Sequence, residues 1–331
     1  LPIVTDCFIR LSQDEALFAK YRAIEASPAF KSLSAVRQRI VKREIRDFVL
    51  SGAALPEAKR ERVKAIGQAL SQASQKFSEN LLDATNAFEL VVTDKAKLAG
   101  IPEETLALYE ASAKAAGKEG WRITLQFPSY LPAMKYCNDR GIREALYRAF
   151  STRAAEFDGG RFDNTPLMTE ILKLRREEAS LLGFPNFDAL SLATKMAESP
   201  EAVLEFLRDL AKRSKPKAEA DVREVNEFAR SELGLDKVEP WDRPYASEKL
   251  RESRFSYSDD EVKRYFTEPT VFAGLFKLVE TLFGIEIVPA EASLWHPDVK
   301  FFEVRRDGQK IANFYADLYA REGKRSGAWM D

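Results

Sequence analysis

Histidine is almost absent from this sequence of 331 residues, which contains only His296. A zinc site of the His-Glu-x-x-His type needs two histidines one helical turn apart, so that both imidazoles reach the same metal ion. A serine or cysteine nucleophile that histidine activates needs that histidine close by. His296 stands between Trp295 and Pro297 beside a predicted strand, and we interpret it as a structural residue that hydrogen-bonds through one ring nitrogen. The residues alone therefore indicate no complete active site.

Cysteine is nearly as scarce. The two cysteines, Cys7 and Cys137, lie far apart in the sequence. This usage is typical of a reducing compartment and argues against a disulfide framework. Their spacing gives no local two-cysteine metal pair, so we expect thiols without a catalytic role. A cytoplasmic protein is the resulting expectation.

Three features of other protein classes are also missing. Neither G-x-G-x-x-G nor G-x-x-x-x-G-K-[ST] occurs, so the sequence predicts no phosphate-binding loop. The 51 Lys and Arg residues nearly balance the 52 Asp and Glu residues, whereas a nucleic-acid-binding protein usually has a basic excess. No apolar run reaches the roughly 18 residues that cross a bilayer. We expect neither nucleic acid nor a membrane as a partner.

The sequence does contain extensive helical periodicity. The longest pattern runs from Pro56 to Val92, with one apolar stripe at steps of three and four residues: Val63, Ile66, Leu70, Ala73, Phe77, Leu81, Ala84 and Phe88. Such a helix spans on the order of 50 Å, and its near-heptad spacing favours antiparallel packing. Further helices are predicted over residues 12–24, 34–50, 102–117, 139–155, 166–182 and 200–231.

Local signals refine these helices. Capping-box patterns at Ser12 with Glu15 and at Ser258 with Glu261 predict helix starts. Pro216 predicts a kink or a break in the helix over residues 200–231. In the helix over residues 34–50, the expected apolar side consists of Val36, Ile40, Ile45 and Val49.

Two segments alternate as strands do. Residues 121–127 predict a short strand, which the proline-containing stretch 128–132 ends. Residues 299–314 predict a β-hairpin with its turn at Asp307 and Gly308. The predicted fold is therefore mainly α, with a small antiparallel hairpin or sheet near residues 298–330. Gly159-Gly160 divides the chain into helical regions 1–158 and 161–331, and residues 240–244 are a second candidate boundary.

Several strings, in one collinear order, resemble the zinc oligopeptidases of the thimet oligopeptidase and oligopeptidase A family. They are KFSENLLDAT (76–85), PSYLP (128–132), DNTPL (163–167), SLATKMAESP (191–200), WD with Tyr245 (241–245), LFGI (282–285), WHPDV (295–299), FY (314–315), DLY (317–319) and KRSGAW (324–329). The resemblance covers essentially the whole chain. Local departures are Thr267-Glu268, Ala312-Asn313 and Ala316, where the family commonly has other residues.

The resemblance implies a fold and an activity. Members are largely helical ellipsoids whose long helices form the wall of a deep channel that admits short unstructured peptides. Zinc and its His-Glu-x-x-His helix belong to the C-terminal half, which by resemblance begins after this chain. We therefore expect an internal fragment that supplies channel wall, binds no zinc and is inactive alone. Its expected partners are short peptides and the missing catalytic half.

The resemblance also suggests a binding site. We expect Gly327, Ala328 and Trp329 to form an edge strand that pairs with an extended peptide. The alternative is that the small Gly327 and Ala328 only allow tight packing beneath Trp329. A fragment would also expose apolar surface near Phe301, Phe302, Phe314 and Tyr315, and self-association would follow. The alternative function is a natural, catalytically inactive helical module that binds peptides or a partner protein.

Overall fold

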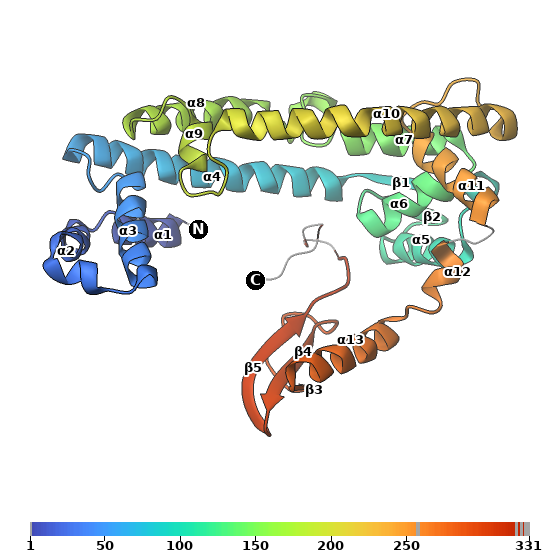
Figure 1. Cartoon of the computed structure of the whole chain (residues 1–331). Coiled ribbons are helices and arrows are strands. Elements are labelled where there is room, and N and C mark those ends of the chain that lie inside the picture. Colours follow the sequence, from blue (N-terminus) through green and yellow to red (C-terminus); the bar gives the residue numbers. More distant parts are fainter. Residues whose placement is uncertain (1, 256–258, 322–323, 325–326, 328–331) are drawn as a thin grey trace. The chain divides into compact units, whose positions relative to one another are not determined.

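The computed structural model describes residues 2–255, 259–321, 324 and 327, and it is mainly α-helical (Figure 1). Its contacts group into two compact units, Leu1–Ala84 with Thr152–Asp221, and Thr85–Ser151 with Val222–Asp331. We call these unit 1 and unit 2 and describe each by itself. The boundary at Gly159-Gly160 that the sequence suggests stays a prediction.

Unit 1 is built from helices. They are α1 (Pro2–Ser12), α2 (Glu15–Ala26), α3 (Ala35–Leu50), α8 (Thr165–Leu181), α9 (Phe187–Leu192) and most of α4 (Glu57–Ala87) and α10 (Pro200–Leu233), with short 3-10 turns at Pro28–Ser32 and Asp158–Gly160. The predicted start of α2 is wrong by two residues, because Ser12 ends α1. Asp14 is the N-cap instead, and its carboxylate accepts the Leu17 N–H at 2.9 Å.

The buried face of α3 differs from the predicted one. Val41 and Phe48 are buried and Ile45 packs against the small core around Phe18 and Phe48, whereas Val36 and Ile40 are 69% and 51% exposed. At 100° per residue, positions 36 and 40 lie nearly opposite position 45, so the four predicted residues do not share one face. The spacing 41, 45, 48 is the true core stripe.

The long helices also differ from prediction in detail. α4 ends at Ala87, and residues Glu89–Val92 are a strand, so the expected helix up to Val92 is too long. α10 continues through Pro216, so the expected break is wrong. The residues around Pro216 are exposed, and water can therefore bond the helix carbonyl that proline leaves without a donor.

Unit 1 contains a buried amide pair. Asn80 of α4 donates through Nδ2 to Oδ1 of Asn164 at 2.9 Å, and Asn164 Nδ2 donates to the Phe77 carbonyl at 3.0 Å. Both side chains are almost fully buried, so each needs these partners. The pair therefore ties the residue before α8 to the C-terminal third of α4.

Unit 2 contains two small antiparallel sheets and several helices. Its elements are β1 (Glu89–Val92), a 3-10 turn (Lys95–Leu98), α5 (Glu103–Ala115), β2 (Trp121–Thr124), α6 (Phe127–Tyr136), α7 (Arg140–Ser151), α11 (Arg243–Phe255), α12 (Asp259–Lys263), α13 (Glu268–Phe283), β3 (Glu286–Pro289), β4 (Lys300–Arg306) and β5 (Gln309–Ala316). β1 pairs with β2, and the other sheet has the order β3-β4-β5. The predicted hairpin is confirmed, although the sheet gains β3 and lies earlier in the chain than the expected 298–330. Ser258 of the second capping box lies outside the described residues.

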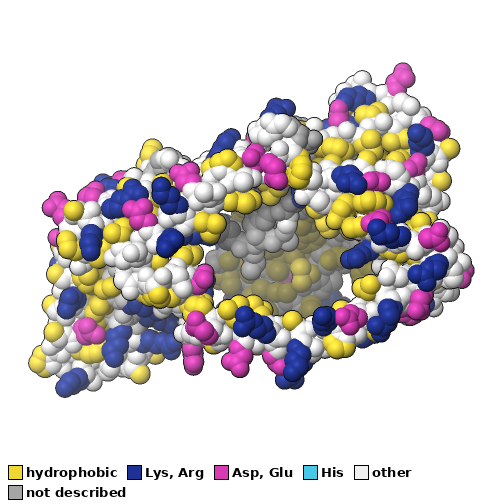
Figure 2. Space-filling model, turned by 90° about the horizontal axis from the view of Figure 1, so that it is seen from above, with side chains coloured by type: hydrophobic (Ala, Val, Ile, Leu, Met, Phe, Trp, Pro, Cys, Tyr) yellow, Lys and Arg dark blue, Asp and Glu magenta, His cyan; other side chains and the backbone are white. Residues whose placement is uncertain are grey.

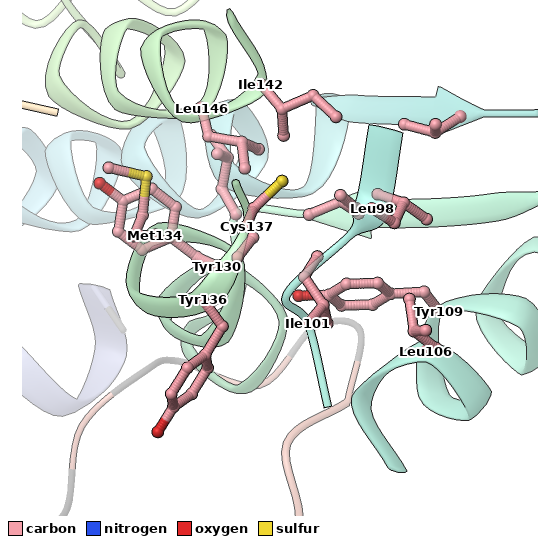
Figure 3. Packing of buried hydrophobic residues seen from close by; sticks show 14 residues of the cluster. Leu98, Ile101, Leu106, Tyr109, Tyr130, Met134, Tyr136, Cys137, Ile142 and Leu146 are labelled. Atoms are coloured by element: carbon pink, nitrogen blue, oxygen red, sulfur yellow. The ribbon is translucent and has the colours of Figure 1, made fainter. Parts of the chain in front are cut away.

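The main core of unit 2 surrounds the first sheet. Leu98, Tyr109 and Leu146 are at most 1% exposed and, with residues of α6, form one cluster (Figure 3). The strand predicted over residues 121–127 ends earlier, at Thr124. The stretch 128–132 that follows belongs to helix α6, and Pro128 fits its first turn, where no N–H is needed. Ser129 supports this start: its Oγ accepts the Thr124 N–H at 2.9 Å, and its carbonyl accepts the Tyr109 hydroxyl.

Exposed apolar surface matches the four aromatic residues expected from the sequence only in part, because Tyr315 is 42% exposed but Phe301 and Phe302 are not. Phe301 and Phe302 are 9% and 6% exposed, because each packs against a neighbouring ring of the sheet. A row on α13 is open instead, at Val271, Leu275, Leu278 and Leu282. Self-association stays a prediction and would involve α13 and not Phe301 or Phe302.

Both charge signs are mixed on the face of the molecule that Figure 2 shows. Figure 2 shows Lys and Arg side chains interspersed with Asp, Glu and hydrophobic ones on the visible face. No helix among the described residues is long and apolar enough to cross a membrane.

Candidate functional site

The sheet β3-β4-β5 has one edge that can accept another strand. The Ala290 N–H donates to the Phe301 carbonyl at 3.1 Å, so the backbone groups of Phe301 face β3. Because these directions alternate along a strand, Phe302 faces β5 and its partner there is Phe314. The same alternation turns the N–H and C=O of Asn313 and Tyr315 away from β4. No strand among the described residues pairs with β5 on that side.

The opposite edge, on β3, is protected. Pro289 pairs with Phe302 in a position where its missing N–H would face outward. The Ile287 N–H, the other outward donor, is bonded to Oε1 of Glu280 at 2.8 Å. Proline and a side-chain acceptor are two devices that stop an edge from pairing. β5 therefore carries the open edge, which we call the β5 edge.

Aromatic packing holds this sheet on α13. Phe272 and Phe276 of α13 lie 5.6 and 5.0 Å from the ring of Phe302, centroid to centroid, and Phe276 also contacts Phe314. On the other face, the Tyr315 ring lies 4.7 Å from Phe301 and 4.9 Å from Trp295. Both faces are thus filled near β5, which keeps the edge in a defined orientation.

A polar cluster fixes the chain that follows β5. Asp317 pairs with both nitrogens of Arg321, at 2.6 and 2.7 Å, and accepts the Trp295 indole N–H at 3.1 Å. Lys324 Nζ lies 3.0 Å from the same carboxylate and donates to the carbonyls of Asp317 and Tyr319. The hydrogen bonds from Arg321 are the main reason that the pKa of Asp317 lies well below its usual range. The segment up to Lys324 is therefore tied to the sheet.

A second ion pair anchors the same segment to α13. Glu268, in the first turn of α13, pairs with Lys300 of β4 and accepts the Tyr319 hydroxyl. The hydrogen bonds from Lys300 and Tyr319 lower the pKa of Glu268. In return, the pKa of Lys300 and that of Tyr319 are raised by their bonds to this carboxylate. These contacts connect α13 with β4 and with the segment that follows β5.

The predicted site residues fall just after this cluster. Gly327 has a φ of +118°, a backbone conformation that L side chains rarely adopt. Ala328 and Trp329 lie outside the described residues. The binding role of these three residues stays a prediction.

The residues predicted to be structural have clear environments. His296 is half-buried, and its Nδ1 accepts the Asp298 N–H at 3.2 Å, which confirms a hydrogen bond through one ring nitrogen. Cys137 is fully buried, and burial raises the pKa of its thiol, whereas Cys7 is exposed. A buried thiol with a raised pKa is a poor nucleophile.

Similarity to known proteins identifies the protein family of this chain. The family model described as "Peptidase family M3" matches residues 133–331. This chain belongs to peptidase family M3. The model for the N-terminal domain of neurolysin and thimet oligopeptidase matches residues 2–60 as well. The resemblance stated from the sequence strings is thereby confirmed.

The M3 relatives are similar along the whole chain. Oligopeptidase A of Escherichia coli (strain K12) is 44% identical over 335 residues, which cover 100% of this chain and 49% of the relative. Organellar oligopeptidase A, chloroplastic/mitochondrial, of Arabidopsis thaliana is 42% identical over 98% of this chain and 42% of its own length. Dipeptidyl carboxypeptidase of E. coli is 32% identical over 95% of this chain and 46% of its own length. The chain spans about half the length of the curated relatives it matches.

Side chains that could bind a metal ion are dispersed in the part of the chain that the structure describes. Among the residues that the structure describes, no group of three or more His, Cys, Asp or Glu side chains lies close enough together to hold a metal ion. Two carboxylates near the sheet, Asp317 and Glu268, already form ion pairs with Arg321, Lys324 and Lys300. These residues therefore do not fit the zinc that the resemblance implies.

Proposed function

We propose that this chain is part of a zinc-dependent oligopeptidase that hydrolyses short, unstructured peptides. Membership of peptidase family M3 supports the hydrolysis of peptide bonds, and the relatives named oligopeptidase A support short substrates. A relative named "Probable cytosolic oligopeptidase A", 42% identical, supports a cytoplasmic location. The observation that carries the proposal for this chain's own residues is the open β5 edge. An extended peptide can be recognised through main-chain hydrogen bonds to a sheet edge, without regard to most of its side chains.

The two regions take different parts in this proposal. Region 1–158 with α4 supplies channel wall, and region 161–331 leads into the sheet. Zinc is held outside the described residues, by the part of the protein that completes the enzyme. The present chain contributes peptide binding and no metal ligand, so it is inactive alone.

The peptide-binding strand is proposed at Gly327, Ala328 and Trp329. Support comes from the cluster around Asp317, which ties Lys324 to the sheet only three residues before Gly327. The β5 edge itself has outward N–H and C=O groups at Asn313 and Tyr315, with which a further strand or an extended peptide can pair.

Peptide hydrolysis itself is the first test. The complete protein is expected to cleave an internally quenched peptide of about ten residues, and a chelator is expected to abolish the cleavage until zinc is restored. The 331-residue chain by itself is the matched control and should show no turnover. Cleavage that survives chelation, or turnover by the 331-residue chain alone, would contradict the proposal.

Substitution of Gly327 tests the binding strand. In the complete protein, Gly327→Val is expected to lower kcat/KM about tenfold or more, because a valine at this φ displaces the backbone that pairs with the peptide. Gly234→Val is the matched control, since Gly234 also has a positive φ, of 65°, and has open space around it. Both variants should lose some stability. If Gly234→Val lowered kcat/KM equally, general strain and not peptide pairing would explain the effect.

A further inference from the structure

Four cationic residues form one stripe on α3. Arg39, Lys42, Arg43 and Arg46 follow each other at steps of three, one and three, so they share a helix face. This face is turned away from the core stripe of Val41 and Phe48. The spacing of these basic residues is visible in the sequence itself.

The stripe is unfavourable for the helix itself. Like charges three or four residues apart repel each other, and they occur here at 39/42, 43/46, 39/43 and 42/46. Among the described residues, Arg46 pairs with Asp47 at 2.7 Å, but Arg39, Lys42 and Arg43 have no carboxylate within ion-pair distance. Lys42 only lies over the Phe30 ring, at 6.0 Å. Folding therefore gains no ion pair from these three charges.

The four cationic side chains line a common hollow. The stripe lines one side of a cavity of about 560 Å³, and residues Thr194–Met196, which follow α9, line another. Lys195 adds a fifth cation, and none of the lining residues is acidic. The volume falls in the range of about 300–1,000 Å³ that is usual for small-molecule sites. All of these residues belong to unit 1.

We propose that this hollow binds a compact anion that carries several phosphate groups. Guanidinium groups match phosphate in a bidentate geometry, and three of the five cations are arginines. A multiply charged anion would also remove the repulsion within the stripe, so it would stabilise α3. The five cations come from two segments that line one hollow, and this arrangement favours a compact ligand over an acidic peptide extended along α3. The proposal is independent of peptide hydrolysis.

Calorimetric titration of the 331-residue chain with inorganic tripolyphosphate tests this site. Saturable binding of one anion per chain is expected, with an affinity that falls as salt is added. Arg43→Gln should raise Kd about tenfold or more, since it removes a charge-assisted hydrogen bond. Arg43→Lys keeps the positive charge but loses the bidentate geometry of the guanidinium group. Its Kd should therefore lie between that of the wild type and that of Arg43→Gln.

Arg37→Gln is the matched control. Arg37 lies on the same helix, is exposed, and does not line the hollow, so its loss should leave Kd within about twofold. Circular dichroism verifies that each variant remains folded. Absence of saturable binding, or equal weakening by Arg37→Gln, would overturn the proposal. Tighter binding of pentaglutamate than of tripolyphosphate would overturn the assignment to phosphate and make the hollow a site for acidic peptides.

Discussion

Replacing Asp242 by alanine is expected to lower the free energy of unfolding by about 3–5 kcal/mol, because it leaves a buried arginine without its counter-charge. Asp242 is 0% exposed and Arg143 is 1% exposed. Arg143 Nη2 lies 2.9 Å from Oδ1 of Asp242, and Arg140 Nη2 lies 2.7 Å from Oδ2. Urea denaturation of the 331-residue chain, followed by circular dichroism, measures the loss.

The contacts of Asp242 explain why the loss is large. Besides the two arginines, its carboxylate accepts the Glu239 N–H at 3.0 Å. Arg143 is held by the carbonyl of Cys137 at 2.6 Å and stacks over the Tyr245 ring at 4.2 Å, so it cannot turn out to water. The carboxylate thus joins the start of α7 to the segment before α11.

A surface ion pair is the matched control. Arg62 and Glu177 form a bidentate pair of the same chemistry at 2.6 and 2.7 Å, but both side chains are substantially exposed. Glu177→Ala should cost only a small fraction of the loss at Asp242, since water screens exposed charges. Equal losses for the two variants would mean that burial does not govern the pair at Asp242.

The effect of Asp242→Ala should depend on pH. Burial alone would raise the pKa of Asp242, but the hydrogen bonds from Arg140 and Arg143 outweigh it and hold the pKa below its usual value. A carboxylate with a lowered folded-state pKa contributes stability above its unfolded pKa, about 3.9, and loses it as the pH falls through the folded value. The difference between wild type and variant should therefore be full at neutral pH and shrink below about pH 4. A constant difference down to pH 2 would contradict this linkage.

The strings that carry the family resemblance turn out to specify structure. Four of them each contain a buried polar residue: Asn80, Ser129, Asn164 and Asp242. Each of these residues hydrogen-bonds to another part of its own unit. A buried polar group that is satisfied by one particular partner tolerates few substitutions, which accounts for a recognisable string around it. The strings identify the family without marking a catalytic residue.

Much of the fold could be predicted because the apolar residues of a single helix recur with helical periodicity. α3, α5, α7, α8 and α10 lie close to their predicted ranges. The errors arose where contacts between distant segments decide the outcome. Phe88 continues the apolar stripe of α4, but Glu89–Val92 become a strand because β2 pairs with them. β3 was missed for the same reason, since four residues carry little pattern of their own.

The candidate site was less predictable than the fold. The hairpin followed from alternation and from the Asp307-Gly308 turn, but nothing local indicates which strand of a sheet lies at its edge. The cluster around Asp317 joins positions 295, 317, 321 and 324, and only the pair of Asp317 and Arg321 has a helix-like spacing that sequence inspection can find. Protection of the β3 edge by Glu280 is likewise a tertiary contact.

A proline substitution within β5 is expected to prevent pairing at the outer edge of β5 while the rest of the sheet stays intact. Asn313→Pro removes an N–H that faces outward, so the ladder between β4 and β5 should persist while pairing at the β5 edge is lost. In the complete protein, kcat/KM for a short peptide is then expected to fall about tenfold or more. Ala312→Pro is the matched control, because the same alternation turns the Ala312 N–H toward β4.

Hydrogen exchange measured by mass spectrometry distinguishes the two proline variants. In Asn313→Pro, the amides of Phe302 and Phe314 should stay protected, whereas in Ala312→Pro their protection should fall with the ladder. Lost turnover with a protected ladder assigns the defect to the edge, because the sheet and its packing on α13 are then intact. If Asn313→Pro left turnover unchanged while its ladder stayed protected, the β5 edge would have no part in peptide binding. The function of the sheet would then be to support α13.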